Sequence, residues 1–331
     1  MIDDQFIGKI NGLKLELDLK KGALETDIKS LKKAARQTVG PELQKRIDTI
    51  IETGLIELNE DFKIYWRKSP IAKLQPGRDY LNPNIVLIVD DILETDQLKK
   101  LNDYLVKWLK NKIQSVLTSL IDLRNLKEKN SSIKALAYQL YENNGVLQRN
   151  QVSDYLKILG QNERKFLRDQ GVKFGRYHVF LHKLIKPEAV SLRTLLWKNY
   201  HQKYFNLKPP VFGLNFLEND EIKNRNFMLL CGFEKFDNFY VRIDILERLF
   251  VQIINSNSEK NEIKLIPEML NLLGCNKDNF KKLLKIMGYK VFEKNNDIFF
   301  KYNPRKSSKK VSKKFIKESP FKVLKNLNLN Q

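Results

Sequence analysis

Residues 164–201 read RKFLRDQGVKFGRYHVFLHKLIKPEAVSLRTLLWKNYH and predict three consecutive elements. A short basic helix ends at Gly171, and the apolar segment VKFGRYHVFL follows it. Pro187 then opens a longer helix, because the first helical turn does not need the N–H that proline lacks. The apolar positions of this longer helix are expected to face a core. They are Val190, Leu192, Leu195, Leu196 and Trp197.

The same stretch is rich in lysine and arginine, which we expect on its outer surface. These residues are Arg164, Lys165, Arg168, Lys173, Arg176, Lys183, Lys186, Arg193 and Lys198. The stretch is therefore interpreted as a rigid hub with a cationic exterior, and it contains no evident catalytic set.

The composition indicates a folded protein that carries a large positive charge. A length of 331 residues predicts about two domains, and a hydrophobic fraction of 42% is sufficient for packed cores. The 60 Lys+Arg against 39 Asp+Glu give a formal net charge of +21, which favours a polyanionic partner. Nucleic acid is the first such partner and an anionic membrane surface the second. A genome that is rich in A and T would also raise the lysine content, and this alternative stays open.

The sequence predicts a cytoplasmic protein. Cys231 and Cys275 are too few for a four-cysteine zinc site and allow one disulfide at most, which favours a reducing compartment. No apolar run approaches the ~20 residues of a membrane span. The first residues, MIDDQF, lack the basic and apolar pattern of a signal peptide.

The first half of the chain is predicted to be mainly helical. A hairpin over 5–19, two helices over 28–35 and 43–51 and a second hairpin suggest a winged-helix-like arrangement. Residues 84–91, NIVLIVDD, predict a strand, and the periodicity over 94–127 predicts one long helix. We expect residues 94–205 to be essentially all-helical.

The C-terminal part has the element order of a winged helix. Two helices end at Gly274 and Gly288, Asn276 is placed as the N-cap of the second helix, and a hairpin turns at Asn295-Asn296. Basic residues are expected on the second helix and the hairpin: Lys277, Lys281, Lys282, Lys285, Lys290, Lys294 and Lys301. Such a module binds nucleic acid or docks on a protein, and helix placement alone does not distinguish the two.

The last residues form a basic tail. Residues 303–331 contain nine Lys/Arg and one Glu, with Arg305, Lys306, Lys309 and Lys310 near the start. A flexible arm of this composition adds salt-sensitive phosphate binding that does not depend on base sequence. The alternative is a solvated spacer.

No catalytic or metal centre is predicted. The chain has no GxxxxGK[ST] loop, so Asp90-Asp91 is interpreted as the end of a strand and not as a magnesium site. His178 and His182 have a spacing that suits one helix face and a metal ion, but their apolar surroundings favour partly buried structural histidines. Carboxylates such as Asp244 and Glu247 are interpreted as salt-bridge partners.

Several stretches of the chain resemble one family in the same order. The chain over about residues 60–290 is similar to the auxiliary C-terminal region of the large alphaproteobacterial DExH-type helicases, which are relatives of the mitochondrial RNA-degradosome helicase. The stretches are IYWRKSPIAKL (64–74), IKALAYQL (133–140), FLRDQGVKFGRYHVFLHKLIKPEAVSLRTLLW (166–197), CGFEKFDNFYVRIDILERL (231–249) and LLGCNKDNFKKLLKIMGYK (272–290). The resemblance implies attachment to a nucleic-acid motor, although no Walker A loop or DExH box is present here.

These observations predict a mainly α protein with small β-hairpins (α+β) and several modules. The modules are 1–83, possibly winged-helix-like; 84–207, helical with the basic hub; 208–303, a strap and a winged-helix-like module; and the tail 304–331. The expected function is that of a nucleic-acid-binding accessory region of an ATP-dependent superfamily 2 helicase. The expected partners are RNA or DNA and motor domains in the same or another chain, with ATP and Mg²⁺ only at that motor and no membrane. The alternative is a protein-interaction scaffold that docks such a machine without binding nucleic acid.

Overall fold

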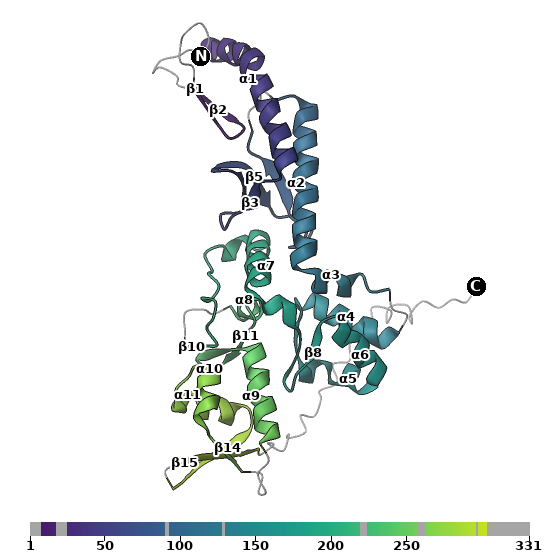
Figure 1. Ribbon diagram of the computed structural model, residues 1–331, viewed down its shortest axis with the longest axis vertical. Coiled ribbons are helices and arrows are strands. Elements are labelled where there is room, and N and C mark those ends of the chain that lie inside the picture. The colour runs from purple at the N-terminus through teal and green to yellow at the C-terminus, as the bar shows by residue number, and fades with distance from the viewer. Residues whose placement is uncertain are drawn as a thin grey trace, which may run out of the picture. The chain divides into compact units, whose positions relative to one another are not determined.

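A computed structural model describes residues 8–17, 25–89, 93–127, 130–218, 224–256, 262–295 and 297–302 (Figure 1). Side chains are described for these residues except 8, 16–17 and 25–38. The chain divides into two compact units, Met1–Val251 and Gln252–Gln331. The fold is α+β with several small antiparallel sheets, as the sequence predicts.

The N-terminal part consists of a hairpin, one long helix and a four-stranded sheet. The hairpin β1 (Gly8–Asn11) and β2 (Lys14–Leu17) turns at Asn11-Gly12 as expected, with Gly12 at φ +61°. The sheet follows the chain in the order β3 (Ile56–Leu58), β4 (Lys63–Trp66), β5 (Ser69–Gln75), β6 (Asn84–Leu87).

The two predicted short helices are wrong, because they form the single helix α1 (Glu25–Thr53), which contains Pro41. Leu43, Ile47 and Ile50 in its second half are buried, and this packing outweighs the local helix-breaking signal.

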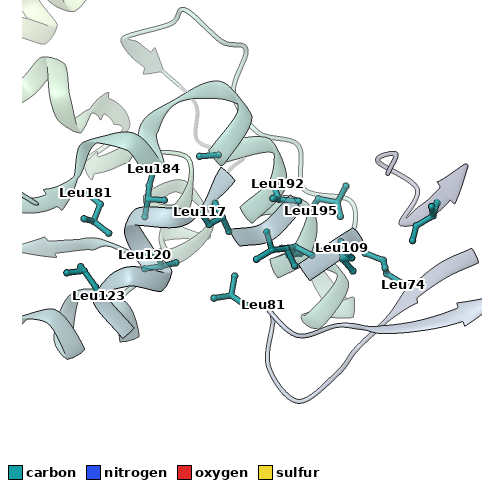
Figure 2. Close-up of a cluster of buried hydrophobic side chains, with 14 of the residues drawn as sticks. Leu74, Leu81, Leu109, Leu117, Leu120, Leu123, Leu181, Leu184, Leu192 and Leu195 are labelled. Carbon is teal, nitrogen blue, oxygen red and sulfur yellow. The ribbon is translucent and has the colours of Figure 1, made fainter. Parts of the chain in front are cut away.

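The long helix predicted over 94–127 is divided in two. α2 (Thr95–Val116) ends before the buried Leu117, and α3 (Thr118–Arg124) follows it. The Thr118 hydroxyl donates to the carbonyls of Gln114 (2.7 Å) and Ser115 (2.9 Å), which competes with continuation of the helix. Figure 2 shows Leu117 and Leu120 from this bend within the main core. α4 (Ser131–Glu142) comes next, capped by Asn130.

Residues 94–205 are not all-helical, because they include a three-stranded sheet that belongs to a recurring arrangement. Three stretches place a strand, one or two helices and a hairpin in this order along the chain. We name them by their last helix: the α6 module (146–181), the α8 module (216–242) and the α11 module (263–302). In each sheet the third strand lies between the first and the second: β7-β9-β8, β10-β12-β11 and β13-β15-β14.

The elements of these modules have the following bounds. The α6 module contains β7 (Val146–Gln148), η1 (Arg149–Val152), α5 (Ser153–Ile158), α6 (Gln161–Asp169), β8 (Val172–Phe174) and β9 (His178–Leu181). The α8 module contains β10 (Phe216–Glu218), α8 (Arg225–Leu230), β11 (Phe233–Phe236) and β12 (Phe239–Arg242). The α11 module contains β13 (Ile263–Lys264), α10 (Pro267–Leu273), α11 (Lys277–Ile286), β14 (Tyr289–Lys294) and β15 (Asp297–Tyr302).

A glycine with the same backbone geometry joins the helix to the hairpin in all three modules. Gly171, Gly232 and Gly288 have φ of +90°, +82° and +89°, a left-handed conformation that glycine adopts at little cost. Each stands two residues after the helix and donates its N–H to the carbonyl three residues earlier, at 2.9, 3.0 and 3.2 Å. Positions can therefore be counted from this turn glycine and compared between the modules.

The helix predicted to open at Pro187 is confirmed as α7 (Pro187–Tyr200), which lies between η2 (His182–Ile185) and η3 (Gln202–Tyr204). Its five predicted apolar core residues are buried. The expectation that Arg193 and Lys198 lie on the outside is wrong, because α7 is covered on several sides and their side chains are 0% and 9% exposed. Burial lowers the pKa of Lys198.

The buried Arg193 ties α7 to the segments on either side of the α6 module and to the α8 module. Its Nη1 donates to the carbonyl of Asn144 at 2.8 Å, and its Nη2 donates to those of Leu184 at 2.6 Å and Leu230 at 2.7 Å. Burial lowers the pKa of this guanidinium to about 10, so it stays charged at neutral pH. These carbonyls, from residue 144, η2 and α8, stabilise the buried charge.

The helix α9 (Ile243–Asn255) follows the α8 module. Its residues Ile245, Leu246, Leu249 and Ile253 are buried, whereas Ile254 is 56% exposed.

Candidate nucleic-acid interface

Two modules carry basic residues at the same positions relative to the turn glycine. In the α6 module Lys165, Arg168 and Lys173 stand six and three residues before Gly171 and two residues after it. In the α11 module Lys282, Lys285 and Lys290 hold these positions relative to Gly288. We call these sets the first and the second basic triplet. All six side chains are exposed, so the hub and the last helix pair share one arrangement of cations.

The first triplet extends from the helix onto the hairpin. Lys165 and Arg168 are three residues apart on α6, a spacing that places their side chains on one helix face. The guanidinium carbon of Arg168 lies 5.9 Å from the ring centroid of Phe174 on β8, the strand that also carries Lys173. None of the three forms an ion pair with another described residue, so their charges are available to a ligand.

The second triplet lies beside a further lysine. Lys290 on β14 is directly opposite Lys301 on β15, and both are exposed. Like charges at opposed positions of an antiparallel pair repel each other, and a bound anion would remove this repulsion. Within residues 262–295 and 297–302, neither Lys282 nor Lys285 forms an ion pair.

The basic position seven residues before the turn glycine has a structural role in both modules. The Nη2 of Arg164 donates to the carbonyl of Leu156 at 2.7 Å. The Nζ of Lys281 lies 2.6 Å from Oε1 of Glu293. Both side chains are half-buried and engaged within their own module, so we do not count them in the triplets.

The other predicted binding residues fall outside the triplets. Arg176 is exposed in the turn between β8 and β9, Lys183 is exposed on η2, and Lys277 is exposed at the start of α11. Lys294 forms an ion pair with Glu262 at 2.6 Å. Predicted residues Arg305, Lys306, Lys309 and Lys310 lie outside the described residues, as does Asp90-Asp91.

The α8 module lacks these cations. The three triplet positions relative to Gly232 are occupied by Asn226, Leu229 and Glu234. Glu234 is 4% exposed, whereas Lys173 and Lys290 at the same position are exposed. This module therefore uses the corresponding position for a contact inside the protein.

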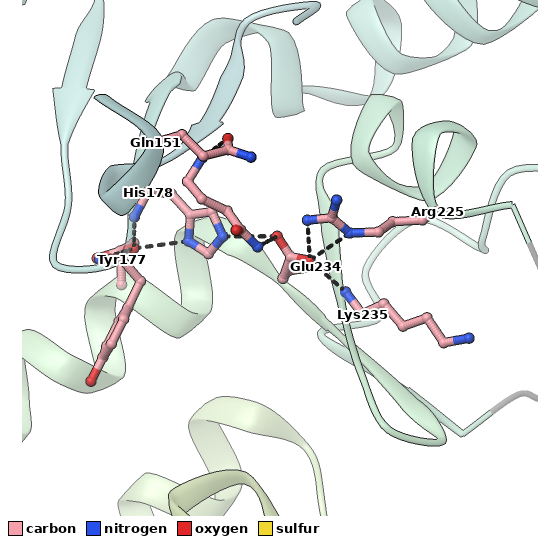
Figure 3. Close-up of polar contacts among 8 residues, drawn as sticks. Gln151, Tyr177, His178, Arg225, Glu234 and Lys235 are labelled. Carbon is pink, nitrogen blue, oxygen red and sulfur yellow. Dashed lines mark hydrogen bonds and ion pairs between the residues drawn. The ribbon is translucent and has the colours of Figure 1, made fainter. Parts of the chain in front are cut away.

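That contact is made with His178 of the α6 module (Figure 3). The Nε2 of His178 lies 3.1 Å from Oε2 of Glu234, and its Nδ1 lies 3.1 Å from Oε1 of Glu247 on α9. Arg225 approaches the other oxygen of Glu234 through Nη2 at 2.9 Å. Both ring nitrogens face a carboxylate oxygen, an arrangement that a protonated imidazolium satisfies with two N–H donors.

The environment stabilises these charges. Burial alone would lower the pKa of His178, but its hydrogen bonds to Glu234 and Glu247 outweigh burial and raise the pKa above 6.5. Burial would raise the pKa of Glu234, but His178 and Arg225 outweigh it and hold the pKa below 4.5.

Glu247 also fixes the turn of the α6 hairpin. Its carboxylate accepts hydrogen bonds from the backbone N–H groups of Arg176, Tyr177 at 3.0 Å and His178 at 2.8 Å. Three N–H donors around one carboxylate hold the tip of this hairpin in a single conformation. The interpretation of Asp244 and Glu247 as salt-bridge partners agrees with the structure, because Glu247 pairs with His178 and Oδ1 of Asp244 lies 2.7 Å from Nε of Arg242.

The three modules share a sequence pattern that becomes visible when they are compared from the turn glycine. Residues 164–173 read RKFLRDQGVK, residues 281–290 read KKLLKIMGYK, and residues 225–234 read RNFMLLCGFE. Each stretch begins with two polar residues and two apolar residues. Three further residues separate these from the turn glycine, and an apolar residue follows the glycine. The spacing between copies differs, so a search for a fixed period does not find them.

The histidines and cysteines named in the sequence analysis all lie among the described residues. His178 lies on β9 and His182 begins η2, so the two do not share a helix face. No disulfide joins Cys231 to Cys275, and burial raises the pKa of Cys231 to about 12. Among the described residues, no group of three or more His, Cys, Asp or Glu side chains is arranged to hold a metal ion. No helix in the described part of the chain has the length and apolar character to cross a membrane.

Comparison with known proteins gives no relative: no family model matches the chain, and no curated protein or solved structure matches it.

Proposed function

We propose that this protein binds nucleic acid through the two basic triplets, which are presented by two winged-helix-like modules. One observation carries the proposal: the same three positions, counted from a turn glycine of the same geometry, carry exposed cations in both modules. The strand order and the helix followed by a hairpin support the winged-helix interpretation.

The physical basis is electrostatic. In each module the last helix lies against the phosphate backbone or a groove, and the hairpin extends the contact along the strand. Lysine and arginine neutralise phosphates and release condensed counterions, which gives affinity without base specificity. The formal charge of +21 adds a long-range attraction toward any nucleic acid.

The narrower proposal is that the chain is an accessory region of a superfamily 2 helicase. It rests on the resemblance of residues 60–290 alone. In this proposal ATP and Mg²⁺ act at a motor outside this sequence, and the chain holds RNA or DNA for that motor. Purification of the chain from its native cells, followed by identification of any bound helicase, tests this part separately.

A salt titration tests binding itself. Fluorescence anisotropy with a labelled 30-base-pair duplex, repeated between 50 and 200 mM salt, gives the slope of log K against log salt concentration. Six phosphate contacts predict a slope of about −5, and contacts from other lysines make it steeper. No binding at 50 mM salt, or binding that does not change with salt, would contradict the proposal.

A protein-interaction scaffold is the second candidate, and the α8 module favours it. This module uses the triplet position Glu234 to contact another part of the protein, so a module of this type serves here as a protein contact. In that case the purified chain would retain a protein partner at a salt concentration that removes nucleic acid.

A further inference from the structure

A cavity of about 560 Å³ lies in the compact unit that contains α2, and no triplet residue lines it. The loop over 76–83, the first two residues of β6, the second half of α2 and α3 form its walls. Its lining consists of three cations, four amide side chains and seven apolar side chains, without a carboxylate. The volume is in the range of small-molecule sites, about 300–1,000 Å³.

The cations of the cavity come from three different segments. They are Arg78 from the loop, Lys110 from α2 and Arg124 from α3. None of them forms an ion pair with another described residue, and the guanidinium carbon of Arg124 lies 5.3 Å from the ring centroid of Tyr141. Arginine forks and a lysine ammonium that converge on one space are suited to a phosphate group.

The apolar lining provides a surface for the rest of the ligand. Leu81, Leu109 and Ile113 line the cavity and are each less than 7% exposed. Figure 2 shows Leu81 and Leu109 in the main core, which holds them in place. An inorganic anion gains no binding free energy from an apolar surface, whereas the flat face of a nucleobase can pack against it.

The loop that closes the cavity is ordered by its own hydrogen bonds. Asp79 does not line the cavity, because its carboxylate accepts from the backbone of Leu81 at 2.9 Å and from the amide of Asn82 at 2.8 Å. The amide of Asn84 donates to the carbonyl of Pro76 at 3.1 Å. A Cβ atom on Gly77 would overlap the carbonyl of Asn82, so glycine permits this close turn. A pre-formed wall reduces the entropic cost of binding.

The larger cavity of about 710 Å³ in the same compact unit has a different character. Glu60, Asp61 and Glu188 line it, together with Lys112 and Lys198. Three carboxylates against two lysines do not favour a phosphate, so the two cavities are chemically distinct.

We propose that the cavity between residues 76–85, α2 and α3 binds an unpaired nucleotide, with its base on the apolar lining and its phosphate at Arg78, Lys110 and Arg124. The nucleotide is either free or part of a single strand. This inference extends the proposed nucleic-acid function to a second site but does not depend on the triplets.

Calorimetry with AMP, UMP, adenosine and inorganic phosphate tests the cavity in the full chain. AMP or UMP is expected to bind at least about tenfold more tightly than inorganic phosphate, because stacking of the base contributes a further free energy. Arg78→Gln combined with Lys110→Gln should weaken nucleotide binding at least about tenfold. Lys107→Gln is the matched control, since this exposed lysine of α2 does not line the cavity, and it should change binding less than about twofold.

A second variant tests the contribution of the cavity's shape to binding separately from that of its charge. Val106 lines the cavity and is 47% exposed, so Val106→Trp fills part of the space without changing the charge or a buried residue. It should weaken AMP binding and leave inorganic phosphate binding unchanged. Equal binding of AMP and inorganic phosphate, or AMP binding that neither variant alters, would overturn the proposal.

Labelled duplexes with and without a single-stranded overhang identify the source of the nucleotide. A preference for the overhang that the cavity variants abolish assigns the cavity to a strand. If these variants lose AMP binding but keep the preference, the cavity takes a free mononucleotide. Binding to the blunt duplex should persist in every cavity variant. If the unmodified chain does not bind the blunt duplex, the proposal for the triplets is contradicted and the proposal for the cavity is not.

Discussion

Lys173 and Glu234 occupy the same position in two modules, two residues after a turn glycine, yet one is exposed and the other is buried against His178. The backbone at both glycines is nearly the same, with φ of +90° and +82°. One arrangement of helix, glycine and hairpin therefore serves for a surface cation in the α6 module and an internal contact in the α8 module.

Removal of either basic triplet should reduce the salt dependence of nucleic-acid binding. Lys165→Gln, Arg168→Gln and Lys173→Gln together should lower the magnitude of the slope by about two to three, because three phosphate contacts are lost. The triple variant of Lys282, Lys285 and Lys290 should have an effect of similar size. Anisotropy titrations at four or more salt concentrations measure both slopes.

The control for these variants removes the same charge elsewhere. Lys99, Lys107 and Lys134 are exposed helical lysines outside the triplets, and their change to glutamine lowers the net charge by the same amount. This variant should reduce the slope by less than about one. Equal effects of all three triple variants would show that net charge alone determines binding.

Stability should depend on pH through His178. Because its pKa is raised in the folded state, the imidazolium contributes stability that is complete below 6.5 and is lost as the pH rises through the raised value. Glu234 has a lowered pKa, so its contribution is present above 4.5 and is lost as the pH falls below that value. The free energy of unfolding should therefore be highest between about 4.5 and 6.5, as far as this cluster determines it.

Urea unfolding followed by tryptophan fluorescence measures this dependence. Trp66, Trp108 and Trp197 all lie in the first compact unit, which also contains the cluster. His178→Gln should remove the loss of stability above pH 6.5. His201→Gln should retain it, because burial lowers the pKa of His201 and gives the opposite sign. An unchanged profile in His178→Gln would show that the cluster does not hold a buried charge.

The sequence predicts many elements because their local signals are strong. Pro187 begins α7 and Asn276 caps α11, each through the local chemistry of one residue. The burial of Arg193 and the carboxylate partners of His178 could not be predicted this way. Arg193 donates to the carbonyl of Leu230 and His178 contacts the carboxylate of Glu234, which lie 37 and 56 residues away in the sequence.

The basic residues of the candidate interface could be predicted from the sequence, but their common arrangement could not. The basic residues of the hub and of α11 were named, but their equivalence depends on Gly171 and Gly288 sharing a left-handed backbone. A helical pattern cannot separate the exposed Arg168 from the buried Arg193, because long side chains with one charge occur at both positions. Only the packing of α7 on several sides decides that difference.

Arg193 should be the most sensitive charged position for stability. Arg193→Met leaves three buried carbonyls without a donor and should lower the free energy of unfolding by about 3 kcal/mol or more. Arg193→Lys keeps the charge but not the planar fork, so an intermediate loss is expected. The exposed Glu188→Gln on the same helix is the control, with a change below about 0.5 kcal/mol. Urea unfolding by tryptophan fluorescence provides the comparison.

Alanine substitutions at two turn glycines should distinguish the cost of left-handed backbone strain from the cost of steric overlap. Gly171 and Gly232 have the same conformation, but a Cβ atom at Gly171 would have its nearest neighbour at 3.9 Å, whereas one at Gly232 would lie 2.9 Å from Cγ2 of Ile185. Gly171→Ala should therefore cost only the left-handed strain, about 1–2 kcal/mol. Gly232→Ala should cost more, because Ile185 must also move. Ile185→Ala removes both γ carbons, so it should reduce this additional cost at Gly232 and should not rescue Gly171→Ala. Urea unfolding of the single and double variants measures these costs, and equal losses for the two alanine variants would show that the contact with Ile185 relaxes freely.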